Sequence, residues 1–77
     1  MPIKPVIDHQ EASFNFRYCK AVRAARMGAG FTQEELAKKL GVGLDAYKKY
    51  ESRSPLPPYL IARFCLHTGR SFADLLA

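Results

Sequence analysis

Apolar and polar residues along this chain recur at the spacing of helices rather than of strands. The clearest segment follows Phe31 and ends at Leu40. At its start, Thr32 and Glu35 have the spacing of a capping box, in which each side chain bonds the other residue's backbone N–H. Gly41 follows where a helix commonly ends with a positive φ. The pattern predicts a short helix that begins after Thr32.

A second short helix is predicted directly after this glycine, from about Leu44 to Ser52. Leu44, Tyr47 and Tyr50 recur at helical spacing and leave charged residues outward. Two short helices joined by a tight turn form a helix-turn-helix, whose second helix can enter the major groove of DNA. An ordinary pair of helices in a small helical domain has the same pattern, so these residues leave both interpretations open.

A longer helix is predicted before this pair. It begins near Ser13 or Asn15, either of which can cap it, and runs to about Met27. Its predicted buried stripe consists of Tyr18, Cys19, Val22 and Ala25 at helical spacing, with Phe14 and Met27 as further candidates at its two ends. Three basic residues at i,i+3 spacing form a ridge: Arg17, Lys20 and Arg23. Such a ridge is usually a solvated surface, but here it adds to the lysines of the helix pair, Lys38, Lys39, Lys48 and Lys49.

Two more helices are predicted after the pair. Pro58 suits the first turn of one, which ends at Gly69. Ser71 and Asp74 have capping-box spacing at the start of the last helix. Five helices and no strand make an all-α fold, and 77 residues make a single domain.

Residues 1–13 differ from the rest of the chain. Pro2 and Pro5 disfavour a helix at the start, and a polar run follows. We expect an extended arm that adds a strand between subunits or places Lys4 against a phosphate, or else a disordered tail. The predicted division is an N-terminal arm at 1–13 and a helical domain at 14–77 that contains the helix pair.

The chain is basic, with a formal net charge of +5 and a sequence pI near 9.5. This balance suits a polyanionic partner, either a nucleic acid or an anionic membrane surface. No apolar run approaches the ~20 residues of a membrane span, and the start lacks an apolar secretory segment. Cys19 and Cys65 each stand among apolar helical neighbours. We therefore expect two buried free thiols in a reducing cytoplasm. From the lack of an apolar run we expect no membrane partner.

The sequence offers little for catalysis or metal binding. It has no glycine-rich phosphate loop and no pattern of a nucleophile beside a base. Cys65 and His67 are two positions apart on one helix, so they point to different faces. Cys19 and His9 do not supply the second paired ligand motif that a zinc site needs. We therefore expect no enzymatic activity, no metal site, no cofactor and no small-molecule substrate.

Several motifs together resemble the lambda-repressor and Cro-like helix-turn-helix family of bacteria and phages, often called the XRE family. The matching segments are TQEELA at 32–37, LGV at 40–42 and YE at 50–51, with single matches at Arg26, Gly30, Gly69, Ser71, Leu75 and Leu76. No gap is needed across residues 22–76. The resemblance implies a five-helix lambda-repressor-like domain that usually binds operator DNA as a two-fold symmetric dimer.

The resemblance also implies roles for residues around the helix pair. Gln33 matches a glutamine that holds a DNA phosphate, although it also fits a surface residue beside a cap. Ser52 matches a polar position that contacts phosphate. Arg53 stands where the family often has glycine, which implies an added phosphate contact or a reshaped loop. Arg26 matches an arginine that pairs with the glutamate at Glu51 in a structural ion pair.

The positions that contact bases in the family carry unusual residues here. By alignment they are Gly43, Leu44, Asp45 and Lys49, with Lys48 alongside. Gly43 has no side chain, and Leu44 can only touch a thymine methyl group or fill the core. Asp45 can accept from a cytosine amino group, but its charge is unfavourable near phosphates unless Lys49 offsets it. Lys48 and Lys49 can reach guanine or phosphate.

These observations lead to one expected function and two alternatives. We expect a sequence-specific transcriptional regulator, a small bacterial or phage-type repressor in the cytoplasm on the nucleoid, that binds double-stranded DNA as a homodimer. The helix around 44–52 lies in the major groove, and the dimer forms through the last helix, the loop 55–58 or the arm. One alternative is an antitoxin or adaptor that holds a protein on this fold, favoured by the weak base-contacting set. The other is RNA binding, although an A-form major groove does not admit this helix.

Overall fold

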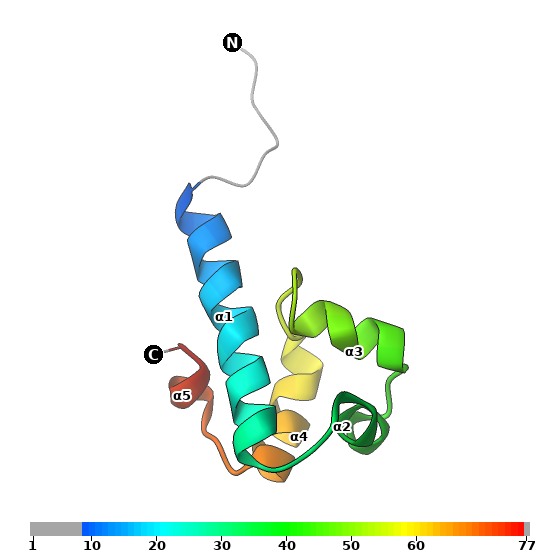
Figure 1. Ribbon diagram of the computed structural model, residues 1–77. Helices are drawn as coiled ribbons and strands as arrows, with labels where there is room; N and C mark the ends of the chain where they lie inside the picture. The colour runs from blue at the N-terminus through cyan, green and yellow to red at the C-terminus, as the bar shows by residue number, and fades with distance from the viewer. Residues whose placement is uncertain (1–8, 77) are drawn as a thin grey trace.

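The computed structural model describes residues 9–76 and, from residue 14, their side chains. This part of the chain folds into five helices with no strand: α1 (His9–Gly28), α2 (Gln33–Leu40), α3 (Leu44–Tyr50), α4 (Pro58–Thr68) and α5 (Phe72–Leu76) (Figure 1). Helix α1 packs against α4 and α5, and α2 packs against α3 and α4. None of the helices within this range has both the length and the apolar character needed to cross a membrane. The predicted all-α fold of five helices is confirmed.

The predicted start of α1 near Ser13 or Asn15 is wrong, because the helix begins at His9. His9 is followed by glutamine, glutamate and alanine, which all have good helix propensity, and an acidic residue is favourable in the first turn of a helix. Helix propensity therefore prevails over both potential caps. The arm boundary predicted at residue 13 falls inside α1, while residues 1–8, with the roles predicted for them, lie outside the described residues.

The hydrophobic core receives side chains from every helix. Its buried members are Tyr18, Val22 and Ala25 of α1, Leu36, Ala37 and Leu40 of α2, Tyr47 of α3, Leu60 and Phe64 of α4, and Leu75 of α5. Leu56, in the loop between α3 and α4, is buried with them. Full burial of a large apolar side chain contributes roughly 1.5–3 kcal/mol. The buried stripe predicted for α1 is confirmed for its four central residues, including Cys19, whereas Phe14 and Met27 are exposed.

The ends of α2 are both closed by hydrogen bonds. The predicted capping box is present: Glu35 N–H donates to Thr32 Oγ1 at 3.1 Å, and Thr32 N–H donates to Glu35 Oε1 at 2.8 Å. At the other end, Gly41 adopts a φ of 78°. Arg63 Nη1 of α4 donates to the carbonyl of Leu40 at 3.0 Å. The chain then enters α3 after a turn of three residues, 41–43.

The sequence also predicted where α4 starts and ends and where α5 starts. Pro58 is the first residue of α4, and Gly69 ends that helix with a φ of 75°. Ser71 N–H donates to Asp74 Oδ2 at 2.9 Å, and Asp74 N–H donates to Ser71 Oγ at 3.2 Å. The hydrogen bonds with the backbone and hydroxyl of Ser71 hold the pKa of Asp74 below its ordinary value. This second capping box starts α5, which Leu75 anchors in the core.

Gly41→Ala should destabilise the protein, because a φ of 78° is unfavourable for any residue with a Cβ. The expected loss is about 1–2 kcal/mol, or a melting temperature lower by roughly 4–16 °C. Thermal or urea unfolding measures it. Lack of space is not the cause, since the added Cβ would lie 3.5 Å from Arg63 Nη1, an ordinary contact.

Gly43→Ala is the matched control for that variant. Gly43 has a φ of −72°, and nothing lies within 4 Å of an added Cβ. Its stability should therefore change by less than about 0.5 kcal/mol. Equal losses in the two variants would contradict a role for the left-handed turn.

Candidate nucleic-acid interface

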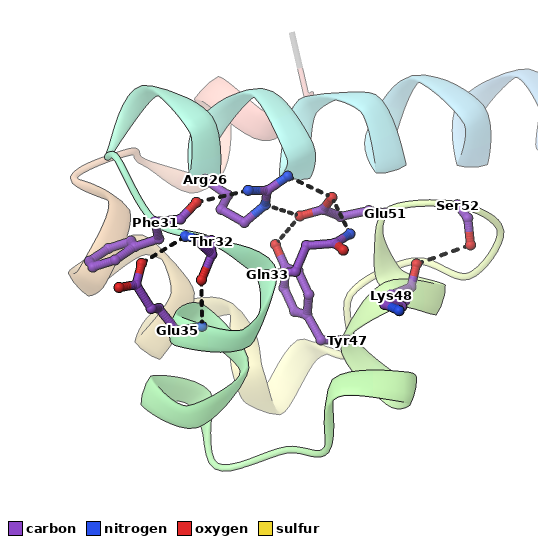
Figure 2. Close-up of polar contacts among 9 residues, drawn as sticks. All are labelled: Arg26, Phe31, Thr32, Gln33, Glu35, Tyr47, Lys48, Glu51 and Ser52. Atoms are coloured by element: carbon purple, nitrogen blue, oxygen red, sulfur yellow. Dashed lines mark hydrogen bonds and ion pairs between the residues drawn. The ribbon is translucent and has the colours of Figure 1, made fainter.

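A single carboxylate joins the first three helices. Glu51 follows α3 as its C-cap, and its side chain is only 4% exposed. Arg26 of α1 donates to it through Nε at 2.6 Å and through Nη2 at 3.3 Å. Gln33 of α2 donates through Nε2 at 3.0 Å, and the hydroxyl of Tyr47 in α3 also donates (Figure 2). The structure thus joins Arg26 and Glu51, the two residues predicted to pair.

Arg26 also holds the loop that leads into α2. Its Nη1 donates to the carbonyl of Phe31 at 2.8 Å, and its side chain is 12% exposed. The hydrogen bonds to Glu51 raise the pKa of Arg26, so the guanidinium stays charged. Because all three nitrogens donate within the protein, this arginine holds α1, the loop and α3 together rather than presenting its charge to solvent.

Tyr47 is a member of this network that the sequence pattern assigned only to an apolar stripe. Its side chain is fully buried. Burial, and then the hydrogen bond to Glu51, raise the pKa of Tyr47 far above its ordinary value. The hydroxyl therefore stays protonated and able to donate at neutral pH. The signal was present in the sequence, because Tyr47 and Glu51 have the i,i+4 spacing of neighbours on a helix.

A surface hollow of about 440 Å³ lies beside this carboxylate. Six residues line it: Arg23, Arg26, Gln33, Lys48, Glu51 and Ser52. Arg26 and Glu51 neutralise each other, so Arg23 and Lys48 leave the hollow positively charged. It also lies at the start of α2, where backbone N–H groups without an intrahelical acceptor favour an anion. The chemistry of the lining suits a phosphate group.

The residues predicted to hold phosphate do not all meet in this hollow. Gln33 and Ser52 line it, whereas Arg53 is exposed outside it. Ser52 Oγ donates to the carbonyl of Lys48 at 3.0 Å, which holds this serine at the end of α3. The amide nitrogen of Gln33 is already bound within the protein. Its backbone N–H at the first position of α2 is the group best placed for an anion.

The outward face of α3 carries charges of both signs. Asp45, Lys48 and Lys49 are exposed, and Leu44 is half-buried. Gly43 precedes the helix as an N-cap without a side-chain hydrogen bond. Lys48 lines the hollow, while Asp45 and Lys49 lie outside it. The residues predicted to contact bases are therefore divided between the positively charged hollow and the open face of α3.

Arg23 is a further member of the site that the sequence assigned only to a basic ridge. It is exposed, and it lines the hollow with Lys48. These two residues lie far apart in the sequence. Only the folded arrangement of α1 and α3 around the carboxylate brings them together, so no local pattern identified Arg23.

The two cysteines are free thiols, as predicted. Cys19 is buried and its Sγ donates to the carbonyl of Ser54 at 3.5 Å, whereas Cys65 is only half-buried. Burial raises the pKa of both thiols, which makes them weak nucleophiles at neutral pH. Over the described part of the chain, no group of three or more histidine, cysteine or acidic side chains is placed to hold a metal ion.

The fold and this arrangement match a known family. A family model for the helix-turn-helix matches residues 22–75, which is most of the chain. The protein therefore belongs to the helix-turn-helix family, a family of DNA-binding transcriptional regulators, and its resemblance to the lambda-repressor and Cro-like branch is confirmed.

Two individual proteins show how far the similarity extends. Over 41 residues the chain is 39% identical to YobD, an uncharacterized HTH-type transcriptional regulator of Bacillus subtilis (strain 168), a match that covers 53% of this chain and 37% of YobD. The chain thus spans little more than a third of that relative's length. The crystal structure of the clp gene regulator ClgR from C. glutamicum matches with a TM-score of 0.72 at 26% identity, over 99% of this chain and 90% of the ClgR chain.

Tyr47→Phe should destabilise the protein although the ring is kept. The change removes a buried donor to Glu51, and a hydrogen bond to a charged group contributes roughly 1.5–3 kcal/mol. Urea unfolding should show a loss of about 2 kcal/mol.

Tyr50→Phe is the matched control, because Tyr50 is half-buried and packs edge-on against Tyr47 with ring centroids 6.1 Å apart. Among the described residues its hydroxyl makes no hydrogen bond to Glu51, so its stability should change by less than about 0.5 kcal/mol. If the two variants lost the same stability, the hydroxyl of Tyr47 would have no special role.

Proposed function

We propose that this protein is a small bacterial or phage-type repressor that binds specific double-stranded DNA with α3 in the major groove. The observation that carries the proposal is the positively charged hollow beside the exposed charged face of α3. An α-helix with its side chains is about 10–12 Å in diameter, and the major groove is about 12 Å wide. Helix α3 therefore fits the groove while the hollow meets the adjacent DNA strand.

In this proposal the hollow holds one backbone phosphate. Gln33, Lys48 and Ser52 line it. The backbone N–H of Gln33 and the ammonium of Lys48 donate to the phosphate, whereas the hydroxyl of Ser52 already donates to the carbonyl of Lys48. Arg53, exposed on the loop after α3, contacts a neighbouring phosphate. These groups fix the position of α3 on the duplex but carry no sequence information themselves.

Base contacts come from the open face of α3. Asp45 accepts from the amino group of cytosine, and Lys49 donates to guanine. The exposed part of Leu44 meets a thymine methyl group. Gly43 has open space around it, so the backbone at the start of α3 can approach the duplex closely. With two hydrogen-bonding side chains per subunit, each half-site specifies only a few base pairs.

Two copies acting together supply the specificity that one copy lacks. We propose a homodimer that binds two half-sites about 34 Å apart. Phe72 and Leu76 of α5 are each 47% exposed, which makes this end of the molecule a suitable interface. The proposed protein acts in the cytoplasm, on the nucleoid, and needs no cofactor, small-molecule substrate or catalytic step.

A protein-interaction module on the same fold is the second candidate. Tyr59 and Leu66 of α4 are 77% and 78% exposed, and their i,i+7 spacing puts them on one stripe of the helix. An antitoxin or adaptor would use such a stripe to hold a protein. The mixed charges on α3 fit this candidate as well, because they make the base-contacting set weak.

Selection of bound sequences from a random duplex pool tests the proposal directly. Enrichment of a two-fold symmetric motif is the expected result, and affinity should fall steeply as salt rises. Lys48→Ala, which removes the lysine that lines the hollow, should lower the slope of log K against log salt by about one unit. Lys39→Ala is the matched control, because this exposed lysine at the end of α2 lines a different hollow. Binding that ignores salt, or no enrichment, would favour the protein-interaction module.

Leu76→Asp should yield a folded monomer, because it places a charge in the proposed interface while Leu75 still anchors α5. Sedimentation and gel-shift assays should show a lighter species and lost cooperative binding. Leu66→Asp, an equal change on α4, should leave the dimer intact. A stable dimer from Leu76→Asp would move the interface elsewhere, and a wild-type monomer on a symmetric site would refute the dimer.

A further inference from the structure

A cationic surface runs from the hollow along α1. Arg23, which lines the hollow, shares one stripe of the helix with Lys20 and Phe16, at i, i+4 and i+7 counted from Phe16. All three side chains are exposed, with Phe16 at 62%. We call these three residues the α1 stripe.

The charge of the α1 stripe is not compensated within the described part of the chain. From residue 14 to residue 28, α1 carries four basic residues and no acidic one. Of these four, Arg26 is the one that pairs with a carboxylate among the described residues. Lys20 Nζ lies 5.2 Å from the centroid of the Phe16 ring. This cation–π contact keeps the ammonium on the stripe.

The α1 stripe also has a suitable length and position for a row of phosphates. Phe16 and Arg23 are about 10 Å apart along the helix, and successive phosphates of one strand rise by about 3.4 Å. In Figure 1 the N-terminal half of α1 extends past the other helices. A duplex seated on α3 and the hollow can therefore continue alongside this half of α1.

We propose that Arg23 and Lys20 bind DNA phosphates beyond the one held in the hollow, and so lengthen the contact with one strand. This inference rests on the proposed DNA binding by α3. A strip of basic residues on a helix is often only a solvated surface. Here the strip begins inside the hollow and lacks acidic neighbours on its own helix segment, which together favour a polyanion.

Arg17 provides a matched control on the same helix. It is exposed like the others and loses the same charge on substitution. At 3.6 residues per turn, however, it lies about 120° around α1 from Arg23 and about 180° from Arg26. The ridge predicted from i,i+3 spacing is therefore a spiral rather than one face, because three residues fall about 60° short of a full turn.

The test compares Arg23→Ala, Lys20→Ala and Arg17→Ala on one long duplex that carries the selected site. Fluorescence anisotropy over a range of salt concentrations gives the slope of log K against log salt. Each stripe variant should lower that slope by about one unit and their combination by about two, while Arg17→Ala leaves it unchanged. Hydroxyl-radical footprinting should show protection lost at the outer phosphates in the double variant. All variants should have the melting temperature of the wild-type protein, because the three side chains are exposed.

The possible outcomes separate this inference from the proposed function. Equal slopes for Lys20→Ala, whose lysine lies outside the hollow, and Arg17→Ala, with an unchanged footprint, would overturn the contact along α1. If Lys48→Ala still lowers the slope in that case, DNA binding by α3 and the hollow stands and only the α1 contact fails. A wild-type protein that binds no duplex overturns both.

Discussion

The arrangement of the first three helices depends on one buried negative charge. A carboxylate that is 4% exposed would cost several kcal/mol if it were left without partners. Glu51 therefore requires Arg26, Gln33 and Tyr47 to reach it together, one from each helix. Apolar residues of similar volume can be as stable as a buried ion pair, so net stability is not what distinguishes this network. Its distinguishing property is geometric, because all three donors reach Glu51 together in one mutual orientation of α1, α2 and α3. Misplacing any of the three leaves a buried polar group without its partner.

The same network shapes the surface beside it. Since the guanidinium of Arg26 is fully engaged within the protein, the net positive charge of the hollow comes from Arg23 and Lys48 at its edge. Gln33 belongs to both parts, because its amide nitrogen bonds Glu51 while its backbone N–H stands at the open start of α2. The internal ion pair and the proposed phosphate site thus share Gln33 and Glu51, and a change at Glu51 would alter both.

The sequence predicted the features that depend on near neighbours in the chain. The capping box of Thr32, the left-handed Gly41 and the start of α4 at Pro58 each follow from residues within about one helical turn. The start of α1 was missed because several weak helix preferences outweighed single caps. The place of Arg23 in the hollow could not be predicted, because it requires α1 and α3 to be packed already. Resemblance to a family supplied the pairing of Arg26 with Glu51, but not the other donors to that carboxylate.

The short turn between α2 and α3, residues 41–43, has a consequence for how the free protein binds a ligand. Only three residues lead from α2 into α3, and Gln33 of α2 bonds Glu51 at the end of α3, so a change in the angle between the two helices would break this hydrogen bond. If α3 binds DNA as proposed, the unbound backbone would already have the shape needed for binding, and little backbone conformational entropy would be lost on association. Diffusion and long-range electrostatic attraction, rather than a slow rearrangement, would then set the association rate. The heat-capacity change of binding would report the apolar surface that is covered, without a contribution from coupled folding.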